Sequence, residues 1–208
     1  ESSNYLKEYG VKNRIIVTSD AAQVINLREH QRSGIRRDDK FLVLVHISGK
    51  RTAEKDILLN SIRQTLFDNE DIRFILSTDQ LTESSLDEDY EMFPQDRSTI
   101  FRYNDPLQLL DLIAESDAVI TTKLHVGIMG CTFGKSVLSF PSHDEKIVRY
   151  YKSIGYAERC LPLNEISEEN AKTLIKRYIF HKIVLPEQIH EAAYHNIKLL
   201  RLFVESII

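Results

Sequence analysis

The residues best suited to chemistry in this chain stand where predicted strands pass into predicted helices. Lys123 and His125 follow a short apolar strand over residues 117–121 and begin an apolar helix over residues 124–131. The N-terminus of a helix is its positive end, and its first N–H groups lack helical partners. A cation and a titratable imidazole at that place suit an anionic ligand. A surface lysine and a histidine that caps its own helix would make the same pattern.

A second group of polar residues follows the next predicted strand, residues 136–140. His143, Asp144 and Lys146 stand there, at the start of a helix predicted over residues 144–154. In an open parallel sheet the carboxyl ends of the strands share one edge, where ligands bind. We therefore expect this group to gather near Lys123, although Asp144 could equally serve only as a helix cap.

A third group follows the most apolar strand of the chain, FLVLVHI over residues 41–47. Ser48, Gly49, Lys50 and Arg51 form its exit turn, where a glycine permits close backbone approach to a ligand and two cations follow. The turn lacks the glycines and the hydroxyl residue of a phosphate-binding loop. Its cations are therefore equally consistent with a solvated turn.

The remaining histidines give little support to a metal site. His46 lies inside the apolar strand, where it is either a core side chain or faces the cleft. His181, His190 and His195 show no ligand spacing, and the acidic stretch 79–96 lacks the spacing of a calcium loop. We expect neither a metal nor a cofactor.

Strands and helices alternate along the chain, which is typical of an α/β doubly wound, mainly parallel, Rossmann-like sheet. A charged stretch near residues 31–40 suggests a connector over 1–38, made of a helix, a strand and a helix, before a domain over 39–208 that ends in a long helix. Strands are predicted at 14–18, 41–47, 72–77, 99–102, 117–121, 136–140 and 160–163, and helices at 53–67, 106–114, 124–131, 144–154, 165–178 and 186–206.

Composition limits the classes of function. The 208 residues are 42% hydrophobic and 28% charged, with a net charge of −4, which argues against a nucleic-acid partner. No apolar run is long enough to span a bilayer, no signal peptide is visible, and two cysteines fit a reducing compartment. We expect a soluble cytoplasmic protein. Because the chain starts inside a helical pattern without Met, we interpret it as a domain or fragment of a longer protein.

One run of the chain resembles the C-terminal signature of the polysaccharide pyruvyl transferase family. The run is ESDAVITTKLHVGIMGCTFGKSVLSF, followed by HDEK and YYKSIG, and it matches an acidic strand start, an Arg-Leu-His triplet, a small-residue helix and an Asp-x-Lys turn. The opening, SSNYLKEYGV and IIVTSDAAQVINL, is similar to that family's preceding motif. The resemblance extends from Ser3 to about Gly155.

The resemblance implies a fold and an activity. Such enzymes have two Rossmann-like halves, similar to type B glycosyltransferases (GT-B), and this chain would be the C-terminal half. They transfer the pyruvyl group of phosphoenolpyruvate to two hydroxyls of a sugar or lipid-linked saccharide, which forms a pyruvate ketal in cell-surface or exopolysaccharide synthesis. The implied partners are the donor, the acceptor and the N-terminal half of the same protein. We expect such an enzyme in the cytoplasm or at the inner face of the membrane.

The resemblance also assigns residues. His125 takes the place of the family's catalytic histidine, and Lys123 that of its arginine. A substrate-binding role is implied for Lys123, and the turn with Ser48, Lys50 and Arg51 lies where the family often has a further anion-binding arginine. For His143, Asp144 and Lys146 we expect substrate binding from their position after the strand over residues 136–140. Lysine keeps the positive charge but loses the two-pronged grip of a guanidinium on a carboxylate or phosphate.

Two alternatives remain open. The domain could be a GT-B glycosyltransferase half that binds a nucleotide-sugar, or a non-catalytic domain that binds an anion or a sugar. The long C-terminal helix is expected to pack on its own sheet or to cross to the missing half.

Overall fold

A computed structural model of the chain describes residues 6–10, 19–24, 39–79, 85–142 and 145–205. The chain divides into two compact units, one made of Glu1–Ile25 with Pro186–Ile208 and the other of Asn26–Leu185. The C-terminal helix thus groups with the N-terminal segment, which differs from the predicted boundary after residue 38. The strand predicted at 14–18 lies outside the described residues.

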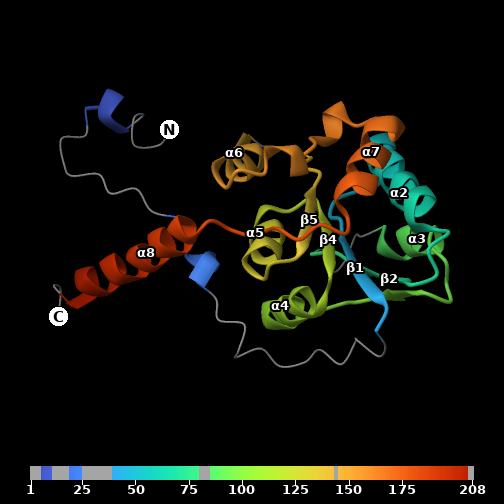
Figure 1. Cartoon of the computed structure of the whole chain (residues 1–208), viewed down its shortest axis with the longest axis horizontal. Helices are drawn as coiled ribbons and strands as arrows, with labels where there is room; N and C mark the ends of the chain where they lie inside the picture. Colours follow the sequence, from blue (N-terminus) through green and yellow to red (C-terminus); the bar gives the residue numbers. More distant parts are fainter. Residues whose placement is uncertain (1–5, 11–18, 25–38, 80–84, 143–144, 206–208) are drawn as a thin grey trace. The chain divides into compact units, whose positions relative to one another are not determined.

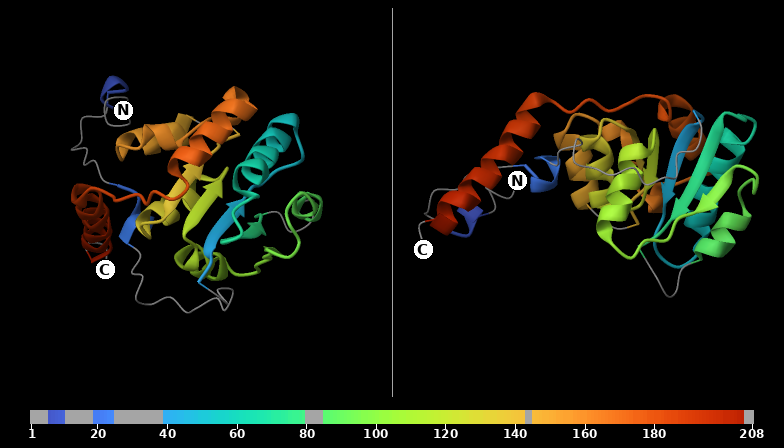
Figure 2. Two further views of the ribbon diagram at one scale, coloured as in Figure 1. Left: turned by 45° about the vertical axis from the view of Figure 1, so that its right-hand side comes forward. Right: turned by 90° about the horizontal axis from the view of Figure 1, so that it is seen from below.

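The larger unit contains a five-stranded sheet in which every pairing is parallel (Figures 1 and 2). The strand order is β3-β2-β1-β4-β5, so the chain reverses its direction of winding between β1 and β4. This arrangement confirms the predicted doubly wound Rossmann-like class. The strands are β1 (Phe41–His46), β2 (Ile72–Ser77), β3 (Ser98–Ile100), β4 (Ala118–Thr121) and β5 (Ser136–Ser139).

Helices cover both faces of this sheet (Figure 1). On one face lie α2 (Ala53–Leu66), α3 (Leu86–Glu91) and α7 (Glu168–Tyr178), whose apolar side chains join the main core cluster. On the other lie α4 (Pro106–Glu115) and α5 (Leu124–Thr132). Because β1 is covered on both faces, its apolar run is nearly continuous, and five of its six residues are buried.

Capping residues determine where several helices begin. Thr52 accepts a hydrogen bond from the Lys55 amide at the start of α2. Asp105 and Gln108 form a capping box before α4, and Ser167 and Asn170 form another before α7. Each of these reciprocal pairs satisfies backbone N–H groups that the helix itself leaves free. The helix predicted from residue 106 begins there, and the helix predicted from residue 165 begins at Glu168.

The strand predicted at 160–163 is wrong. A single parallel bridge joins Ser139 to Cys160, and the chain then enters the short 3-10 helix η4 (Leu163–Glu165). The Leu161 N–H donates to the Ser139 carbonyl and the Leu163 N–H to the Pro141 carbonyl, so hydrogen bonds flank Pro162, but the chain turns into η4 at Leu163 before a full strand is formed. Before the bridge, η3 (Ala157–Arg159) follows α6 (Glu145–Ser153).

The smaller unit is built around α8 (Glu187–Glu205), which contacts the 3-10 helix η1 (Ala21–Val24). His190 Nδ1 lies 3.1 Å from the carbonyl oxygen of Gln23, and the Asn196 amide donates to the carbonyl of Ser19 over 3.3 Å. The described contacts of α8 are therefore with the N-terminal segment. Among the described helices, neither α8 nor any other is long and apolar enough to cross a membrane.

Candidate functional site

Lys123 lies at the junction between β4 and α5, at the edge of the sheet where a ligand can bind. Lys123 is the N-cap residue of α5 with an extended backbone (φ −111°, ψ 135°), and its N–H donates to Thr121 Oγ1 over 3.0 Å. The helix packs closely on the sheet because it carries glycine at position 130, where a Cβ would lie 2.8 Å from Val137 Cγ2. Lys123 and the first turn of α5 therefore occupy a fixed position at the sheet edge.

A pocket of about 480 Å³ opens at this edge, inside the larger unit. Its lining comes from the residues that end or follow all five strands, next to the point where the strand order reverses. Ligands of doubly wound sheets bind at such a point. The lining residues are His46, Asp79, Tyr103, Thr122, Lys123, Leu124, His125, Val126, Ser142 and Ile147.

An ion pair lies across the pocket lining. Lys123 Nζ is 2.9 Å from Asp79 Oδ2, and the two side chains are 45% and 38% exposed. Burial alone would raise the pKa of Asp79, but the neighbouring Ser48 hydroxyl and the Lys123 ammonium outweigh it, so this pKa is lowered. The lysine charge that suits an anionic ligand is thus paired with a carboxylate of the same chain.

His46 is the most unusual residue of the lining. Its side chain is 1% exposed, and neither ring nitrogen has a hydrogen-bond partner among the described residues. Burial lowers its pKa to about 4; the charge of Asp79 opposes this shift and that of Lys123 adds to it. The imidazole is therefore neutral at neutral pH, with one N–H donor and one acceptor lone pair. The ring of Tyr103 lies beside it, with centroids 6.4 Å apart.

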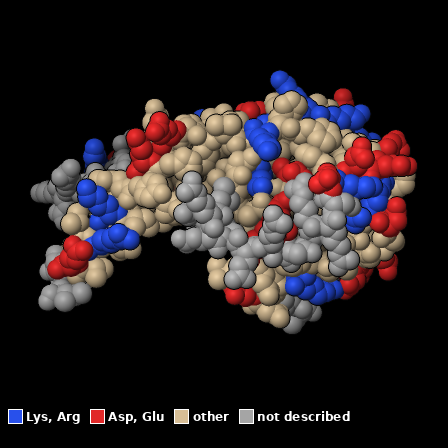
Figure 3. Space-filling view, turned by 60° about the horizontal axis from the view of Figure 1, so that its bottom comes forward, with Lys and Arg blue, Asp and Glu red and all other residues tan. Residues whose placement is uncertain are grey.

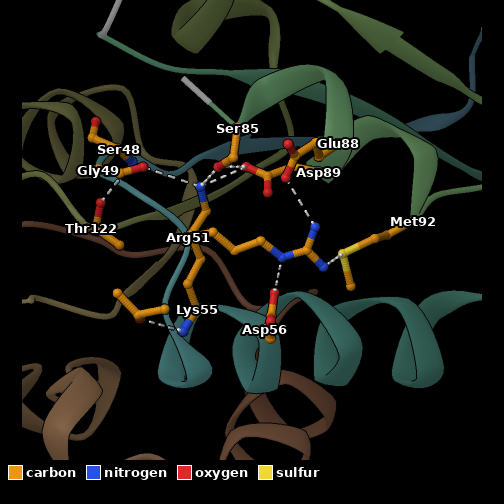
Figure 4. A network of polar contacts seen from close by, with 11 residues as sticks. Ser48, Gly49, Arg51, Lys55, Asp56, Ser85, Glu88, Asp89, Met92 and Thr122 are labelled. Atoms are coloured by element: carbon orange, nitrogen blue, oxygen red, sulfur yellow. Dashed lines mark hydrogen bonds and ion pairs between the residues drawn. The ribbon is translucent and has the colours of Figure 1, made fainter. Parts of the chain in front are cut away.

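In the turn after β1, Ser48 is bonded to the end of β4, whereas the two cations of the turn lie away from the pocket lining. The Ser48 N–H donates to Thr122 Oγ1 over 3.2 Å, which ties this turn to the end of β4. Arg51 instead pairs with Asp56 at 2.7 Å and with Glu88 at 3.3 Å (Figure 4). Neither Arg51 nor the exposed Lys50 lines the pocket.

A buried ion pair contacts the same turn. Lys55 Nζ lies 2.7 Å from Asp89 Oδ2, and both side chains are 4% exposed. The same ammonium donates to Ser85 Oγ and to the Gly49 carbonyl (Figure 4). Gly49 itself has φ +101°, a conformation that favours glycine. Lys55 thus joins α2, α3 and the turn. In the sequence it stands among charged and polar residues at the start of a helix, where a lysine is normally solvated.

The predicted site residues fall into three groups. Lys123 and His125 both line the pocket, with His125 on its exposed side. Lys146 is exposed on the first turn of α6 and does not line it. His143 and Asp144 lie outside the described residues.

Sequence reasoning missed Asp79, Tyr103 and Ser142, and left His46 undecided between core and cleft. Asp79 and Ser142 follow β2 and β5 within three residues, and Tyr103 follows β3. The rule that identified Lys123, a polar residue just after a strand, would have found all three. Tyr103 is additionally a large side chain at an otherwise polar turn.

The charge distribution gives no single basic surface on the face drawn in Figure 3, where lysine and arginine alternate with aspartate and glutamate. In the described part of the chain, no group of three His, Cys, Asp or Glu side chains is arranged to hold a metal ion. The chemistry of the pocket therefore rests on Lys123, Asp79, the two histidines and the first turn of α5.

Comparison with known proteins identifies a family signature in this chain. The family model described as polysaccharide pyruvyl transferase matches residues 1–144, which include the whole of β4 and α5. A sequence search of the curated proteins found no match.

The fold is similar to that of solved two-domain enzymes of the GT-B type. The structure of S. aureus MnaA with UDP superposes with a TM-score of 0.71 at 13% identity, over 98% of this chain and 58% of that one. A putative UDP-N-acetylglucosamine 2-epimerase from Listeria monocytogenes gives 0.68 at 15% identity, over 99% and 57%. The UDP-GlcNAc 2-epimerase from Methanocaldococcus jannaschii gives 0.66 at 12% identity, over 96% and 59%. This chain thus spans less than two thirds of these proteins, and the likeness concerns the fold.

Proposed function

Because the chain belongs to the polysaccharide pyruvyl transferase family, we propose that it binds phosphoenolpyruvate and transfers its pyruvyl group to two hydroxyls of a saccharide. The observation that carries the proposal is the position of Lys123 and His125 at the start of α5, on a pocket at the reversal point of the sheet. We further propose that the chain works as the C-terminal half of a two-domain enzyme, in the cytoplasm or at the inner face of the membrane.

The donor needs positive charge, because phosphoenolpyruvate carries a phosphate and a carboxylate. The first turn of α5 offers N–H groups and the positive end of the helix dipole, and Lys123 adds a full charge. When the donor binds, Lys123 would either leave Asp79 and contact the donor, or contact both at once. A lysine can do this readily, since its ammonium is a compact charge on a flexible stem with three rotatable donors.

His125 is proposed as the acid that starts the reaction. Its imidazolium gives a proton to the methylene carbon of phosphoenolpyruvate, which leaves a cation at C2. One sugar hydroxyl adds to C2 and loses its proton to a base. The second hydroxyl then replaces the phosphate at C2 and loses its own proton, which yields the cyclic ketal and inorganic phosphate. The exposed position of His125 on the lining is open to both substrates.

The other predicted substrate-binding residues have different support. Ser48 lowers the pKa of Asp79 and so acts on the pocket through that carboxylate. A role for Lys50 rests on the family resemblance, and roles for His143, Asp144 and Lys146 rest on their position in the sequence after a strand. Arg51 already has two carboxylate partners, which favours a structural role at the turn over donor binding.

Calorimetry with phosphoenolpyruvate is the direct test of the donor site. We expect Lys123→Ala to weaken binding about tenfold or more, because a charge-assisted contact is lost. Lys152→Ala, on the exposed end of α6, is the matched control and should bind as the wild type does. Equal donor binding by Lys123→Ala and wild type would contradict the assignment.

Turnover tests the role of His125. In the full-length enzyme, His125→Ala is expected to lower kcat by about 10²–10⁴, the usual contribution of a general acid. An unchanged rate would exclude His125 as the acid while leaving the donor site intact.

The second candidate is a nucleotide-sugar site in the same pocket. It is favoured by the fold shared with S. aureus MnaA, which was solved with UDP. A UDP-sugar added as a competitor in the calorimetry separates the two. Binding of the UDP-sugar without phosphoenolpyruvate binding would favour this second candidate.

A further inference from the structure

We propose that the side of the pocket formed by His46, Asp79 and Tyr103 is a hydroxyl-binding subsite that holds the saccharide acceptor. The inference rests on the proposed function, since it divides one pocket between the two substrates of that reaction. The anionic donor takes the side at the start of α5, and the acceptor takes the side at the ends of β1, β2 and β3.

The first argument is the unsatisfied state of His46. The ring is 1% exposed and lines the pocket, yet neither nitrogen bonds to a described residue. Burying a polar group without a hydrogen bond costs free energy, and native proteins rarely leave such groups. A ligand in the pocket would supply the missing partners.

The second argument is the kind of partner that these side chains require. A neutral imidazole presents one donor and one acceptor, and a hydroxyl group can satisfy both. The Asp79 carboxylate only accepts hydrogen bonds, and besides Lys123 it has acceptor positions left for a ligand hydroxyl. Its negative charge also repels an anion from this side of the pocket.

The third argument is the chemistry of the donor. Phosphoenolpyruvate has no alcohol hydroxyl to give to Asp79 or His46, and its charged groups suit the start of α5. The hydroxyls must therefore come from the other substrate, which by the proposed reaction is a polyol. Tyr103, half-buried beside His46, adds an aromatic ring against which the apolar face of a sugar can pack.

Ligand-observed NMR on the full chain tests the subsite, with simple methyl glycosides, phosphoenolpyruvate and a UDP-sugar as separate probes. We expect methyl glycosides to bind and His46→Phe to weaken them about tenfold, the effect of one or two lost hydrogen bonds. His46→Asn, which keeps an amide donor and acceptor, should recover part of the loss. His181→Phe, an exposed site outside the pocket, is the control.

Thermal unfolding of the same variants distinguishes a binding role from a structural one. An apolar ring in place of an unsatisfied imidazole should not lower Tm. If His46→Phe does not fold, Tyr103→Ala at a half-buried position provides the second variant, and it should weaken glycosides but not phosphoenolpyruvate.

The inference is overturned if the wild type binds no methyl glycoside, or if both pocket variants bind glycosides as the wild type does. It is also overturned if only UDP-sugar binding depends on His46, because the hydroxyls would then belong to a nucleotide-sugar. Phosphoenolpyruvate reports on the proposed function separately. A wild type that binds glycosides through His46 but not phosphoenolpyruvate would refute the donor and retain the subsite.

Discussion

Lys123 illustrates how one side chain depends on its partner. The resemblance to the family presents it as a cation in place of an arginine, and the structure pairs it with Asp79 at 2.9 Å. Both groups are substantially exposed, so solvent screens their attraction and the pair is easily exchanged. A reversible pair of this kind would keep the pocket nearly neutral until an anion arrives.

Asp79→Asn is therefore expected to tighten phosphoenolpyruvate binding. The amide keeps the shape of the side chain and removes the charge that competes for Lys123, and an exposed pair of this type is worth about 2–5-fold in affinity. Calorimetry at low ionic strength measures the change, and added salt should reduce it. Weaker binding by Asp79→Asn would mean that the carboxylate helps to hold the donor.

The pH dependence of stability should carry the signature of His46. Its pKa in the folded protein, about 4, lies below the ordinary value of 6.5, so the unfolded chain takes up this proton first as the pH falls. The free energy of unfolding should then decrease from pH 6.5 towards pH 4, by roughly 3 kcal/mol for this residue.

Comparison with His46→Phe isolates that effect from the titration of other groups. The difference in unfolding free energy between wild type and variant, measured by denaturant titration at several pH values, should grow in favour of the variant below pH 6.5. Parallel pH profiles would show that the imidazole has a partner in the folded protein that stabilises its charged form.

Within α5, two glycines determine how closely the helix approaches its neighbours. A Cβ on Gly127 would lie 2.6 Å from the hydroxyl oxygen of Tyr151, a fully buried side chain on α6. The position of Lys123 and His125 at the pocket depends on this packing, because both belong to the start of the same helix.

Gly127→Ala is expected to lower the free energy of unfolding by about 1–3 kcal/mol, the usual cost of overpacking a core. In a Tyr151→Phe background the hydroxyl is gone and the ring carbon Cζ would lie 3.6 Å away, an ordinary contact. There the higher helix propensity of alanine should make the same change stabilising by about 1 kcal/mol. Denaturant unfolding of the wild type, the two single variants and the double variant measures both effects of Gly127→Ala. If this change still destabilises the Tyr151→Phe protein, the clash is with another residue.

The chain as a whole is organised as two units, and the pocket lies within one of them. The main core cluster, from Val43 to Ile179, belongs entirely to the unit Asn26–Leu185. The helix α8 has one buried residue among those described, Ala193, and it is joined to Gln23 and Ser19 of the N-terminal segment through His190 and Asn196.

A chain limited to residues 26–185 is therefore expected to fold by itself. It retains the sheet, its helices on both faces and every residue of the pocket lining. Its thermal unfolding, followed by circular dichroism, should stay cooperative, with a Tm within a few degrees (about 5 °C) of the sheet unfolding transition in the full chain. A broad transition without cooperativity would show that the core depends on the smaller unit.

The alternation of strands and helices, most helix starts and the candidate site residues after β4 could be predicted from the sequence alone. These features are local: β1 is a run of apolar residues, Ser167 and Asn170 stand three apart, and Lys123 directly precedes its helix. Hydrophobic periodicity and helix capping depend on residues that are close in the sequence, so the local sequence pattern predicts them. The prediction failed at residues 160–163 because an apolar run does not indicate where the chain turns. This segment forms hydrogen bonds through Leu161 and Leu163 but then enters η4.

Only the tertiary structure decided which polar residues meet. Asp79 reaches Lys123 from 44 positions away (123 − 79), and Lys55 finds Asp89 across two elements. The sequence does not indicate whether the ring nitrogens of His46 have hydrogen-bond partners. The pairing of β1 with β2 and β4 places this residue at the pocket. Such contacts depend on strand order and register, which arise from the cooperative packing of the whole sheet, and no short stretch of sequence encodes them.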